Sequence, residues 1–476
     1  MVHNLPERQV IRIWQHLLLN RTELVTEADE RLKIIYPGRV NDDQGADFRD
    51  AVIATSQGLI KGDIEVHVNS SDWQAHRHHR DPVYNRVVLH VVMWRDTKAA
   101  TILENGKDIP VLALHKYIKA PISQWPEWMV ERDFVRKAPQ DFFGDVLSRP
   151  CLNAAERLNT GVLAQLLDCA GEERFSAKAA KFQANLTQME ASQTLYLGIM
   201  GALGYSRNKL PFTELARRLP LRILESAVQS GVSDGECLAR QQAFLLGTAG
   251  LLPSQRRDRH QKNKSGEWVD ELERLWTSSR HPGVMSPNDW HLFKVRPNNS
   301  PVRRIVAMSY LVLRYRGRGM LAEVVDMVKE ASTSKEYHRL ESKLVITTDG
   351  YWASHLDFGL SRRIKSPTLL GMGQAANIIV NVILPFTFAW GKLTSQPELG
   401  QKSLELYRHY PKLVANAVER HMKAQLGLSS SLVNSARRQQ GLIHIYNTLC
   451  TQGRCNSCPL GGSHLAQLEA GNYVKV

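Results

Sequence analysis

Acidic and histidine residues near the N-terminus have the types and spacing that metal-assisted hydrolysis requires. Asp63, Glu65 and His67 occupy alternate positions, so in a β-strand their side chains project from one face. Asp47 lies in the preceding segment, which a turn at Ser56–Gly58 separates from this strand. In an antiparallel pair, Asp47 and Glu65 come to one end of a small sheet, where two carboxylates suit Mg²⁺ or Mn²⁺. His67 is then placed to ligate the metal, or to orient or deprotonate an attacking water molecule.

A second group of ionisable residues follows the strand and offers an alternative site. His76, His78, Asp81 and His90 supply the imidazole and carboxylate ligands that zinc and manganese accept. A His/Asp metal hydrolase that uses these residues, without Asp47, is therefore a separate hypothesis. The chain contains 17 histidines, so some clustering arises by chance, and a solvated polar face is the alternative explanation.

The elements that must position these residues can be predicted from the spacing of the apolar side chains. Val10, Ile13, Trp14 and Leu17 recur at helical spacing, and the segments after them alternate as strands do. The expected elements are a helix over 7–19, strands over 31–36, 47–55 and 59–68, a short helix over 72–79 and an apolar strand over 87–94. This α-β-β-β-α-β order predicts a small α+β core, which we assign to residues 1–125.

The remainder of the chain is predicted to be mostly α-helical. We assign a large helical domain to residues 126–443 and a short cysteine-rich tail to residues 444–476. Basic residues gather in two poorly hydrophobic stretches of the helical domain. Because Lys and Arg neutralise phosphates, we expect nucleic-acid contacts there from Arg256, Arg257, Arg259, Lys262, Lys264, Arg296, Arg303 and Arg304.

The charge of the whole chain agrees with a polyanionic partner. Its 476 residues include 61 Lys and Arg against 47 Asp and Glu, a net charge of +14 with a pI near 9.5. Such an excess favours nucleic acid as the partner, with DNA expected before RNA. A hydrophobic content of 43% and a charged content of 23% exclude wholesale disorder and fibrous classes. The oligomeric state does not follow from these values.

The cysteine content and the apolar runs indicate the compartment. Six cysteines are too few for a disulfide-stapled secreted scaffold of this length. The N-terminus lacks an uninterrupted apolar stretch of the signal-peptide kind. The most apolar run, 377–390, is interrupted by Asn381 and Pro385 and is shorter than the ~20 residues that a membrane span needs. We therefore expect a cytoplasmic protein without a membrane partner.

Three cysteines near the C-terminus have the spacing of a metal site. Cys450, Cys455 and Cys458 form a C-x4-C-x2-C pattern, in which neighbouring thiolates can bind one metal from a single turn. We expect this site to hold the tail in place rather than to perform chemistry. A fourth ligand is needed, and the residues leave several alternatives open: His464, His444, Cys151, Cys169 and Cys237.

The N-terminal region resembles the PD-(D/E)XK nuclease superfamily. The resemblance lies in the α-β-β-β-α-β order, in Gly45-Ala46-Asp47-Phe48 and in Gly62-Asp63-Ile64-Glu65-Val66-His67. It implies that Asp47 and Glu65 bind a divalent metal and that His67 takes the position that is normally lysine. Histidine can act as a base or a metal ligand, but it is not a permanent cation at neutral pH. Glu7 on the first helix matches the additional acidic residue of some members.

The cysteine tail resembles two other groups of proteins. Residues 449–460 are similar to the cluster loop of helix-hairpin-helix DNA glycosylases. They are also similar to nucleases related to helicase–nuclease complexes, in which three C-terminal cysteines pair with one distant N-terminal cysteine. The latter resemblance implies Cys151 as the fourth ligand of a [4Fe–4S] cluster, whereas closure by His464 favours zinc.

Over nearly its full length, the chain is similar to a poorly characterised bacterial family, domain of unknown function 2851. Besides the two glycine-containing motifs above and the cysteine tail, the resemblance rests on Ser71-Asp72-Trp73, Tyr84-Asn85, Leu89-His90-Val91-Val92, Leu203-Gly204-Tyr205 and Arg296-Pro297-Asn298. The family name implies no activity.

Taken together, the residues favour a metal-dependent nuclease that hydrolyses phosphodiester bonds in DNA or RNA. Asp47 and Glu65 are expected to bind Mg²⁺ or Mn²⁺, and His67 to orient water. The alternative is a nuclease-like protein that has lost catalysis and acts as a nucleic-acid-binding or scaffold protein. The chain shows no Gly-rich phosphate loop, serine nucleophile elbow or dinucleotide fingerprint, so NTPase, α/β-hydrolase and dehydrogenase functions have no support.

Overall fold

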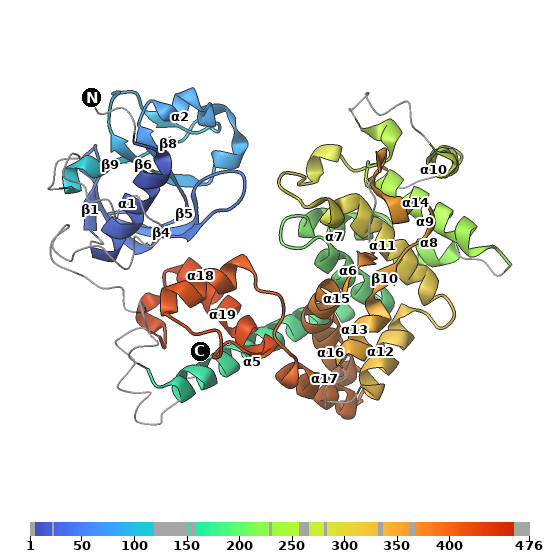
Figure 1. The fold of residues 1–476 in the computed structure, drawn as a ribbon. Helices are drawn as coiled ribbons and strands as arrows, with labels where there is room; N and C mark the ends of the chain where they lie inside the picture. Colours follow the sequence, from blue (N-terminus) through green and yellow to red (C-terminus); the bar gives the residue numbers. More distant parts are fainter. Residues whose placement is uncertain are drawn as a thin grey trace. The chain divides into compact units, whose positions relative to one another are not determined.

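The chain forms two units, and the first of them is assembled from separate stretches of sequence. The computed structural model describes residues 5–20, 23–118, 151, 158–227, 231–256, 266–279, 283–331, 337–361 and 368–460. The N-terminal unit comprises Met1–Ala170, Ala415–Val433 and Gln440–Val476. The helical unit comprises Gly171–Val414 and Asn434–Gln439 (Figure 1). The fold class is α+β, as predicted.

A mixed seven-stranded sheet organises the N-terminal unit. Its strands are β1 (Glu23–Val25), β2 (Arg31–Tyr36), β3 (Arg39–Val40), β4 (Phe48–Thr55), β5 (Gly58–Asn69), β6 (Val87–Trp94) and β9 (Val111–Ala113). The order is β1-β2-β4-β5-β6-β9, with β3 paired to β4. Strand β5 is antiparallel to β4 and parallel to β6, which is itself parallel to β9. The predicted strands are therefore confirmed, and the short strands β1, β3 and β9 extend the sheet beyond them.

Helix α1 (Glu7–Asn20) covers one face of this sheet. Its buried side chains Val10, Ile13 and Trp14 lie in one apolar core with Ile64 and Val66 of β5. The helical spacing on α1 and the two-residue spacing on β5 bring these side chains to a common interface. Burial of their apolar surface is the main term that fixes α1 against β5.

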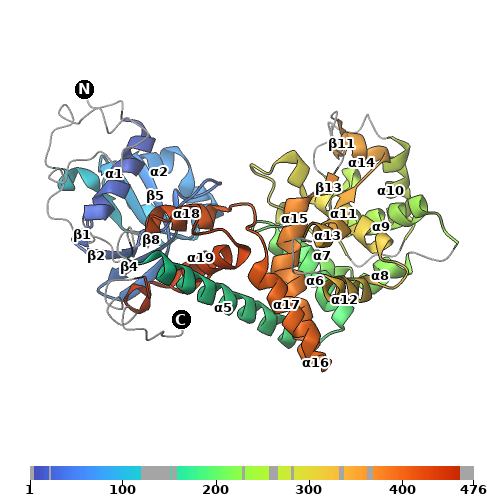
Figure 2. The same cartoon turned by 60° about the horizontal axis from the view of Figure 1, so that its bottom comes forward.

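The opposite face of the sheet carries two further layers. Over β5 and β6 lies a covering segment, residues 72–84, made of α2 (Asp72–Ala75) and the 3₁₀ turns η1 (His78–Arg80) and η2 (Pro82–Tyr84). Over β2 and β4 lie the start of α5 (Thr160–Leu186), then α18 (Ala417–Leu426) and α19 (Ala436–Thr448), which Figure 2 shows beside β4. A two-stranded pair, β7 (Thr101–Ile102) and β8 (Asp108–Ile109), lies outside the main sheet.

The domain boundaries differ from those expected from the sequence. From sequence, residues 126–170, 415–433 and 440–443 are assigned to the helical domain, and the tail from 444 is assigned to a separate piece. All these stretches belong to the N-terminal unit instead. The reason is apolar packing, because Met422, Leu442 and Ile445 share one buried core with Tyr36 and Val52 of the sheet. Such long-range contacts leave no periodic signal in the local sequence.

The helical unit is built from helices around one large apolar core, as predicted. Serine caps two of them: Ser233 Oγ accepts from the amide of Glu236 at α9, and Ser300 Oγ accepts from the amide of Arg303 at α11. Its principal helices are α6 (Ala191–Leu203), α7 (Lys209–Arg218), α8 (Leu221–Ser226), α9 (Asp234–Thr248), α10 (Glu267–Thr277), α11 (Pro301–Arg314), α12 (Met320–Glu330), α13 (Tyr337–Leu344), α15 (Met372–Ile378), α16 (Leu384–Leu393) and α17 (Pro397–His409).

The most apolar run is helical without interruption. A π-helical turn, Ile379–Ile383, joins α15 to α16, which has Pro385 as its second residue. In a regular α-helix the ring of a proline clashes with the carbonyl four residues earlier, and the wider π-turn relieves this clash. Among the described residues, Met372–Leu393 is therefore long and apolar enough to cross a membrane by length and composition. Its most apolar window is 72% buried inside the protein, as in the core helix of a globular domain.

Candidate functional site

The strands β4 and β5 bring Asp47 and Glu65 into direct reciprocal contact. The amide of Asp47 donates to Glu65 Oε2 at 3.0 Å, and the amide of Val66 donates to Asp47 Oδ2 at 3.0 Å. A bulge lies beside this pair, where Asp50 adopts a positive φ of 63° and the register between the strands shifts. Bulges change the direction of neighbouring side chains, and this bulge lies where both carboxylates point to the same end of the sheet. The predicted pairing is therefore present.

Burial makes the charge of this carboxylate pair costly. Desolvation, followed by repulsion from Glu65, raises the pKa of Asp47 to about 8. Desolvation and the charge of Glu7 raise the pKa of Glu65 to about 8, against the lowering effect of the amide hydrogen bond from Asp47. Glu7, at the start of α1, thus lies close enough to act on both carboxylates. Three acidic groups therefore share one end of the sheet, where a cation would relieve their repulsion.

His67 lies behind Glu65 in a chain of buried hydrogen-bonding groups. Its Nδ1 is 2.9 Å from His90 Nε2, and His90 Nδ1 is 3.2 Å from Thr101 Oγ1. Both histidines are 0% exposed. Desolvation, then the neighbouring histidines, lowers the pKa of His67 to about 2, and desolvation, then His78, lowers the pKa of His90 to about 3. Both imidazoles are therefore neutral at neutral pH, so His67 does not replace a lysine as a cation.

The covering segment contributes two further histidines to the same place. His78 Nε2 is 3.3 Å from Glu65 Oε1, and His67 Nε2 is 3.5 Å from the same oxygen. His76 Nδ1 is 3.3 Å from His67 Nε2. One ring nitrogen from each of His67, His76 and His78 lies within 4.8 Å of the others. The sequence placed His76 and His78 in a separate hypothesis, but the structure joins them to Glu65 and His67.

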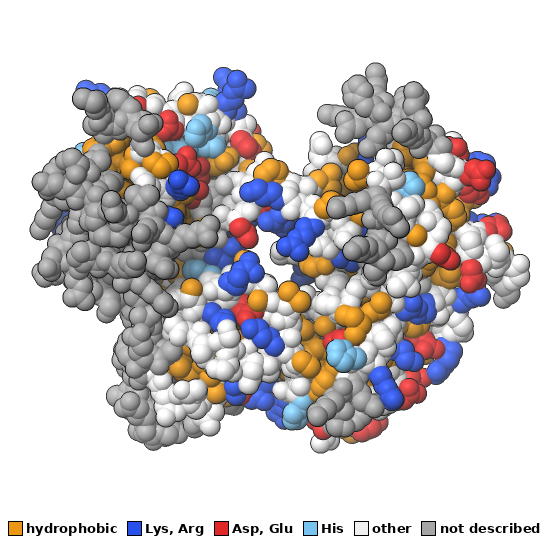
Figure 3. Space-filling view, viewed as in Figure 1, with side chains coloured by type: hydrophobic (Ala, Val, Ile, Leu, Met, Phe, Trp, Pro, Cys, Tyr) orange, Lys and Arg blue, Asp and Glu red, His pale blue; other side chains and the backbone are white. Residues whose placement is uncertain are grey.

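Aromatic packing and one acidic anchor hold the covering segment in place. The ring of Tyr84 lies on His78 with centroids 3.8 Å apart, and buried Trp73 donates from Nε1 to the carbonyl of Ile102 at 3.0 Å. Asp96 accepts from the amide of Ser71 at 2.9 Å, directly before α2. These contacts fix the backbone that carries His76 and His78. Figure 3 shows histidine and acidic side chains adjoining on the surface of this unit.

Two acidic residues near the site have structural roles instead. Asp63 Oδ1 accepts from the amide of Asp50 at 3.0 Å and lies 3.4 Å from Arg86 Nη2, so it supports the bulge. Asp81 caps η2 by accepting from the amide of Val83 at 3.0 Å. Asp63, Glu65 and His67 occupy alternate positions of β5, as predicted. However, the register shift beside Asp63 gives it other partners, the amide of Asp50 and the side chain of Arg86.

Gly62 allows the close approach of β5 and β6 beside the site. A Cβ on this residue would lie 2.3 Å from Val88 Cγ1 and 2.4 Å from the carbonyl oxygen of Arg86. Both distances are shorter than van der Waals contact, and the second involves backbone. Glycine in the Gly62–His67 motif therefore has a steric reason, separate from the chemistry of the acidic residues.

The cysteine tail packs on the sheet and meets a fourth cysteine. Cys450 and Cys458 are buried in one core, and Cys151 packs against that core. Desolvation, followed by Cys151, Cys458 and Cys455, raises the pKa of the Cys450 thiol, so these thiols are electrostatic neighbours. Of the alternatives for the fourth ligand, Cys151 is thus brought to the tail. His464 lies outside the described residues.

Two arginines predicted to bind nucleic acid are buried, and for them the prediction is wrong. Arg303 is 0% exposed and donates to the carbonyls of Trp352, His355 and Thr368. Arg304 is 6% exposed and donates to the carbonyl of Leu369, the hydroxyl of Tyr205 and the side chain of Asn299. Both guanidinium groups are buried and donate to backbone carbonyls of the helical unit, so a phosphate in solvent does not reach them.

The other predicted basic residues have varied surroundings. Arg256 is half-buried and pairs with Asp357 at 3.0 Å while lying over the ring of Phe358. Arg296 is exposed, as a phosphate contact requires. Arg257, Arg259, Lys262 and Lys264 lie outside the described residues.

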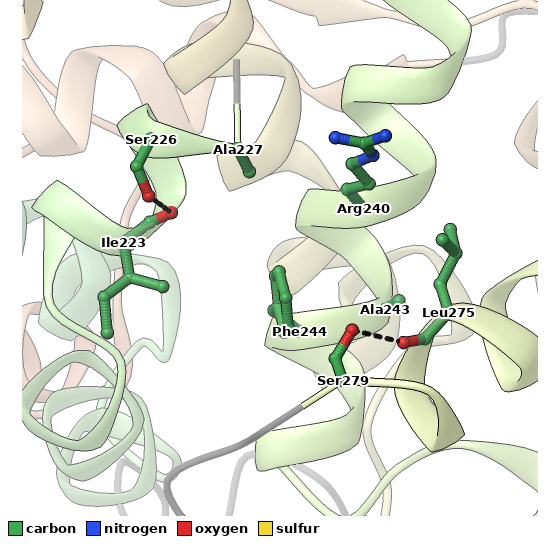
Figure 4. Close-up of a pocket in the computed structure, with 8 residues that line it drawn as sticks. All are labelled: Ile223, Ser226, Ala227, Arg240, Ala243, Phe244, Leu275 and Ser279. Carbon is green, nitrogen blue, oxygen red and sulfur yellow. Dashed lines mark hydrogen bonds between the residues drawn. The ribbon is translucent and has the colours of Figure 1, made fainter. Parts of the chain in front are cut away.

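A pocket of about 380 Å³ lies in the helical unit, apart from these clusters (Figure 4). Apolar side chains dominate its lining, which consists of Ile223, Ser226, Ala227, Arg240, Ala243, Phe244, Leu275 and Ser279. Arg240, the one charged residue of that lining, pairs with Glu236 at 2.6 Å. The pocket therefore offers no converging ionisable groups of the kind seen around Glu65.

Comparisons with known proteins place the chain in a family. No curated protein and no solved structure matches it. A family model described as a protein of unknown function, DUF2851, matches residues 7–413, which is most of the chain. The chain therefore belongs to this family of unknown function.

Proposed function

We propose that the protein is a metal-dependent phosphodiesterase that acts on nucleic acid, with DNA expected before RNA. The observation that carries the proposal is the reciprocal hydrogen bonding of Asp47 and Glu65, which holds two carboxylates together at one end of a mixed sheet. The order of α1, β2, β4, β5, α2 and β6 agrees with the PD-(D/E)XK arrangement. The net charge of +14 supports a polyanionic substrate.

The donor set fits a divalent cation. Each carboxylate uses one oxygen to accept a backbone amide, which fixes its orientation. Burial, followed by repulsion from the neighbouring acidic groups, raises the pKa of both, and a bound cation would offset this cost. Asp47 and Glu65 would hold Mg²⁺ or Mn²⁺, with Glu7 nearby as a further acidic group. When bound, such an ion would neutralise phosphate charge and make a water molecule more acidic.

His67 would contribute as a neutral imidazole. Its Nε2 faces Glu65 Oε1 at 3.5 Å, and its Nδ1 is held by His90. A neutral imidazole can accept a hydrogen bond from water or donate a lone pair to a metal, but it cannot supply the permanent positive charge of a lysine. The exposed ring of His76, 3.3 Å from His67 Nε2, lies between this buried group and solvent.

The test is a cleavage assay on single- and double-stranded DNA and RNA with Mg²⁺ or Mn²⁺. The variants are Asp47→Ala and Glu65→Ala, with Asp63→Asn as the matched control, because Asp63 lies on the same strand but pairs with Arg86. The proposal expects activity in the wild type and the control, and loss in both alanine variants. Equal activity in all four folded proteins would exclude it.

A second candidate is a nuclease-like protein that binds nucleic acid without cleaving it. The complete burial of the uncharged His67 favours this candidate, since no cation occupies the lysine position. It predicts salt-sensitive binding that survives Glu65→Ala, with no cleavage under any divalent metal. The same set of variants therefore separates the two candidates.

We propose in addition that the cysteines hold a structural zinc ion or a [4Fe–4S] cluster. Cys450 and Cys458 are buried beside Cys151, and Gly453 lets this loop approach the sheet, since a Cβ there would lie 2.8 Å from Val52 Cγ1. Four thiolates suit either group, and closure by Cys151 favours the cluster. Metal analysis and the visible absorbance of anaerobically purified protein distinguish the two: iron with brown absorbance indicates the cluster, and zinc alone indicates zinc.

A further inference from the structure

Three imidazoles and one carboxylate oxygen converge beside the Asp47–Glu65 pair. His67 and His78 present Nε2 to Glu65 Oε1 at 3.5 and 3.3 Å, and His76 completes the group from the protein surface. The rings of His67 and His78 are stacked, with centroids 5.1 Å apart and planes 10° from parallel. Three nitrogen donors and one oxygen donor make a typical ligand set for zinc, whereas Mg²⁺ prefers oxygen ligands and retained water.

The hydrogen bonds of His67 Nδ1 are compatible with metal binding by Nε2 of the same ring. If Thr101 Oγ1 accepts from His90 Nδ1, then His90 Nε2 accepts from His67 Nδ1, and the lone pair of His67 lies on Nε2. In this tautomer the lone pair faces Glu65 Oε1, and a metal ion between the two atoms would bind both of them. Metal-binding histidines are oriented in this way by a partner on the other ring nitrogen.

We propose that His67, His76, His78 and Glu65 form a transition-metal site that binds Zn²⁺. The site shares Glu65 and His67 with the proposed function and goes beyond it in its three nitrogen ligands, and its occupancy does not depend on any cleavage. Two of its ligands come from the covering segment and two from β5, so the metal joins that segment to the sheet.

The experiment measures zinc binding to the full chain after removal of metal by a chelator. His76→Ala is the first variant, because His76 is the exposed member of the group and its loss removes no buried side chain. His79→Ala is the matched control, since His79 lies in the same segment but outside the group of converging nitrogens. We expect wild type and His79→Ala to bind the same number of zinc ions. His76→Ala is expected to lose affinity at one site on the order of 100-fold, as removal of a ligand should.

Cobalt substitution separates this site from the cysteines. Co²⁺ bound to thiolates gives a charge-transfer band, whereas Co²⁺ bound to imidazole and carboxylate gives only ligand-field bands. We expect His76→Ala to lose the ligand-field bands of the histidine site and to leave any band from the cysteines unchanged. His78→Gln, checked for folding by circular dichroism, should behave like His76→Ala.

The outcomes for the metal site and for cleavage are distinguishable. Equal zinc content and affinity in the wild type, His76→Ala and His79→Ala would overturn the zinc site, even in a protein that cleaves DNA with Mg²⁺. Zinc binding that depends on His76, in a protein that cleaves no nucleic acid, would uphold the zinc site and remove the proposed function.

Discussion

Asp47 and Glu65 are each oriented by the backbone of the other's strand. Glu65 Oε2 accepts from the amide of Asp47, and Asp47 Oδ2 accepts from the amide that follows Glu65, both at 3.0 Å. Neither carboxylate can turn away without leaving a buried amide unpaired, a cost of about 1–3 kcal/mol. The structure thus keeps two carboxyl groups together, an arrangement that has a clear physical reason when a cation binds there.

The first prediction concerns the stability of the metal-free protein at high pH. Glu65 has a folded-state pKa of about 8, above its unfolded value, so the folded state binds protons more tightly. Stability from this group is present at low pH and lost as pH rises through 8. Glu65→Gln removes the loss, on the order of 3 kcal/mol between pH 5 and 9. Chemical denaturation at both pH values measures it. Equal losses of stability between pH 5 and 9 in the wild type and the variant would contradict the raised pKa.

The second prediction concerns His67 and acid. Its folded-state pKa of about 2 lies below the unfolded value of 6.5, so the unfolded chain binds more protons between these values. Stability is therefore full above pH 6.5 and falls below it. We expect the wild type to lose about 2 kcal/mol more than His67→Gln between pH 7 and 5. Denaturant titrations at the two pH values test this. Parallel losses in both proteins would show that His67 titrates normally.

The third prediction concerns the steric role of Gly62. An added Cβ would meet the Arg86 carbonyl at 2.4 Å, so Gly62→Ala should destabilise the N-terminal unit by about 2–3 kcal/mol. Gly235→Ala is the control, because nothing lies within 4 Å of its added Cβ and the residue is helical. This control should be neutral or slightly stabilising. Thermal unfolding compares them. Similar melting temperatures would show that β5 and β6 have room to separate.

The fourth prediction separates structural from exposed arginines. Arg303→Ala leaves the carbonyls of Trp352 and His355 without their donor, so it should destabilise the helical unit by about 3 kcal/mol or more. Arg296→Ala changes an exposed residue and should leave the melting temperature unchanged. A stable Arg303→Ala variant with weakened binding to nucleic acid would restore the original expectation for Arg303.

Local patterns predicted the strands well, because alternation of side chains is a property of each strand alone. The approach of Asp47 to Glu65 also followed from the strand order. His76 and His78 could not be joined to Glu65 from sequence, since short turns without periodicity carry them over the sheet. Cys151 was implied only by the resemblance to nucleases of helicase–nuclease complexes, because tertiary packing and no local pattern brings it to the tail.

The burial of Arg303 and Arg304 has a signal in the sequence. Arg303 and Arg304 stand between Val302 and Ile305 in a strongly apolar helix. Such a helix has few polar residues that could form a solvent-exposed face around the two arginines. This context indicates that the two guanidinium groups are buried and bind backbone carbonyls, and that they are not exposed to bind a phosphate.

DNA cleavage by the full chain with Mn²⁺ or Mg²⁺, in the wild type, Asp47→Ala and Asp63→Asn, is the decisive experiment for the carboxylate pair. Loss of a metal ligand should remove several kcal/mol of transition-state stabilisation, a factor of about 1000 in rate. We expect Asp47→Ala to lose activity by this factor and Asp63→Asn to retain it. Cleavage that persists in folded Asp47→Ala at the wild-type rate would contradict it.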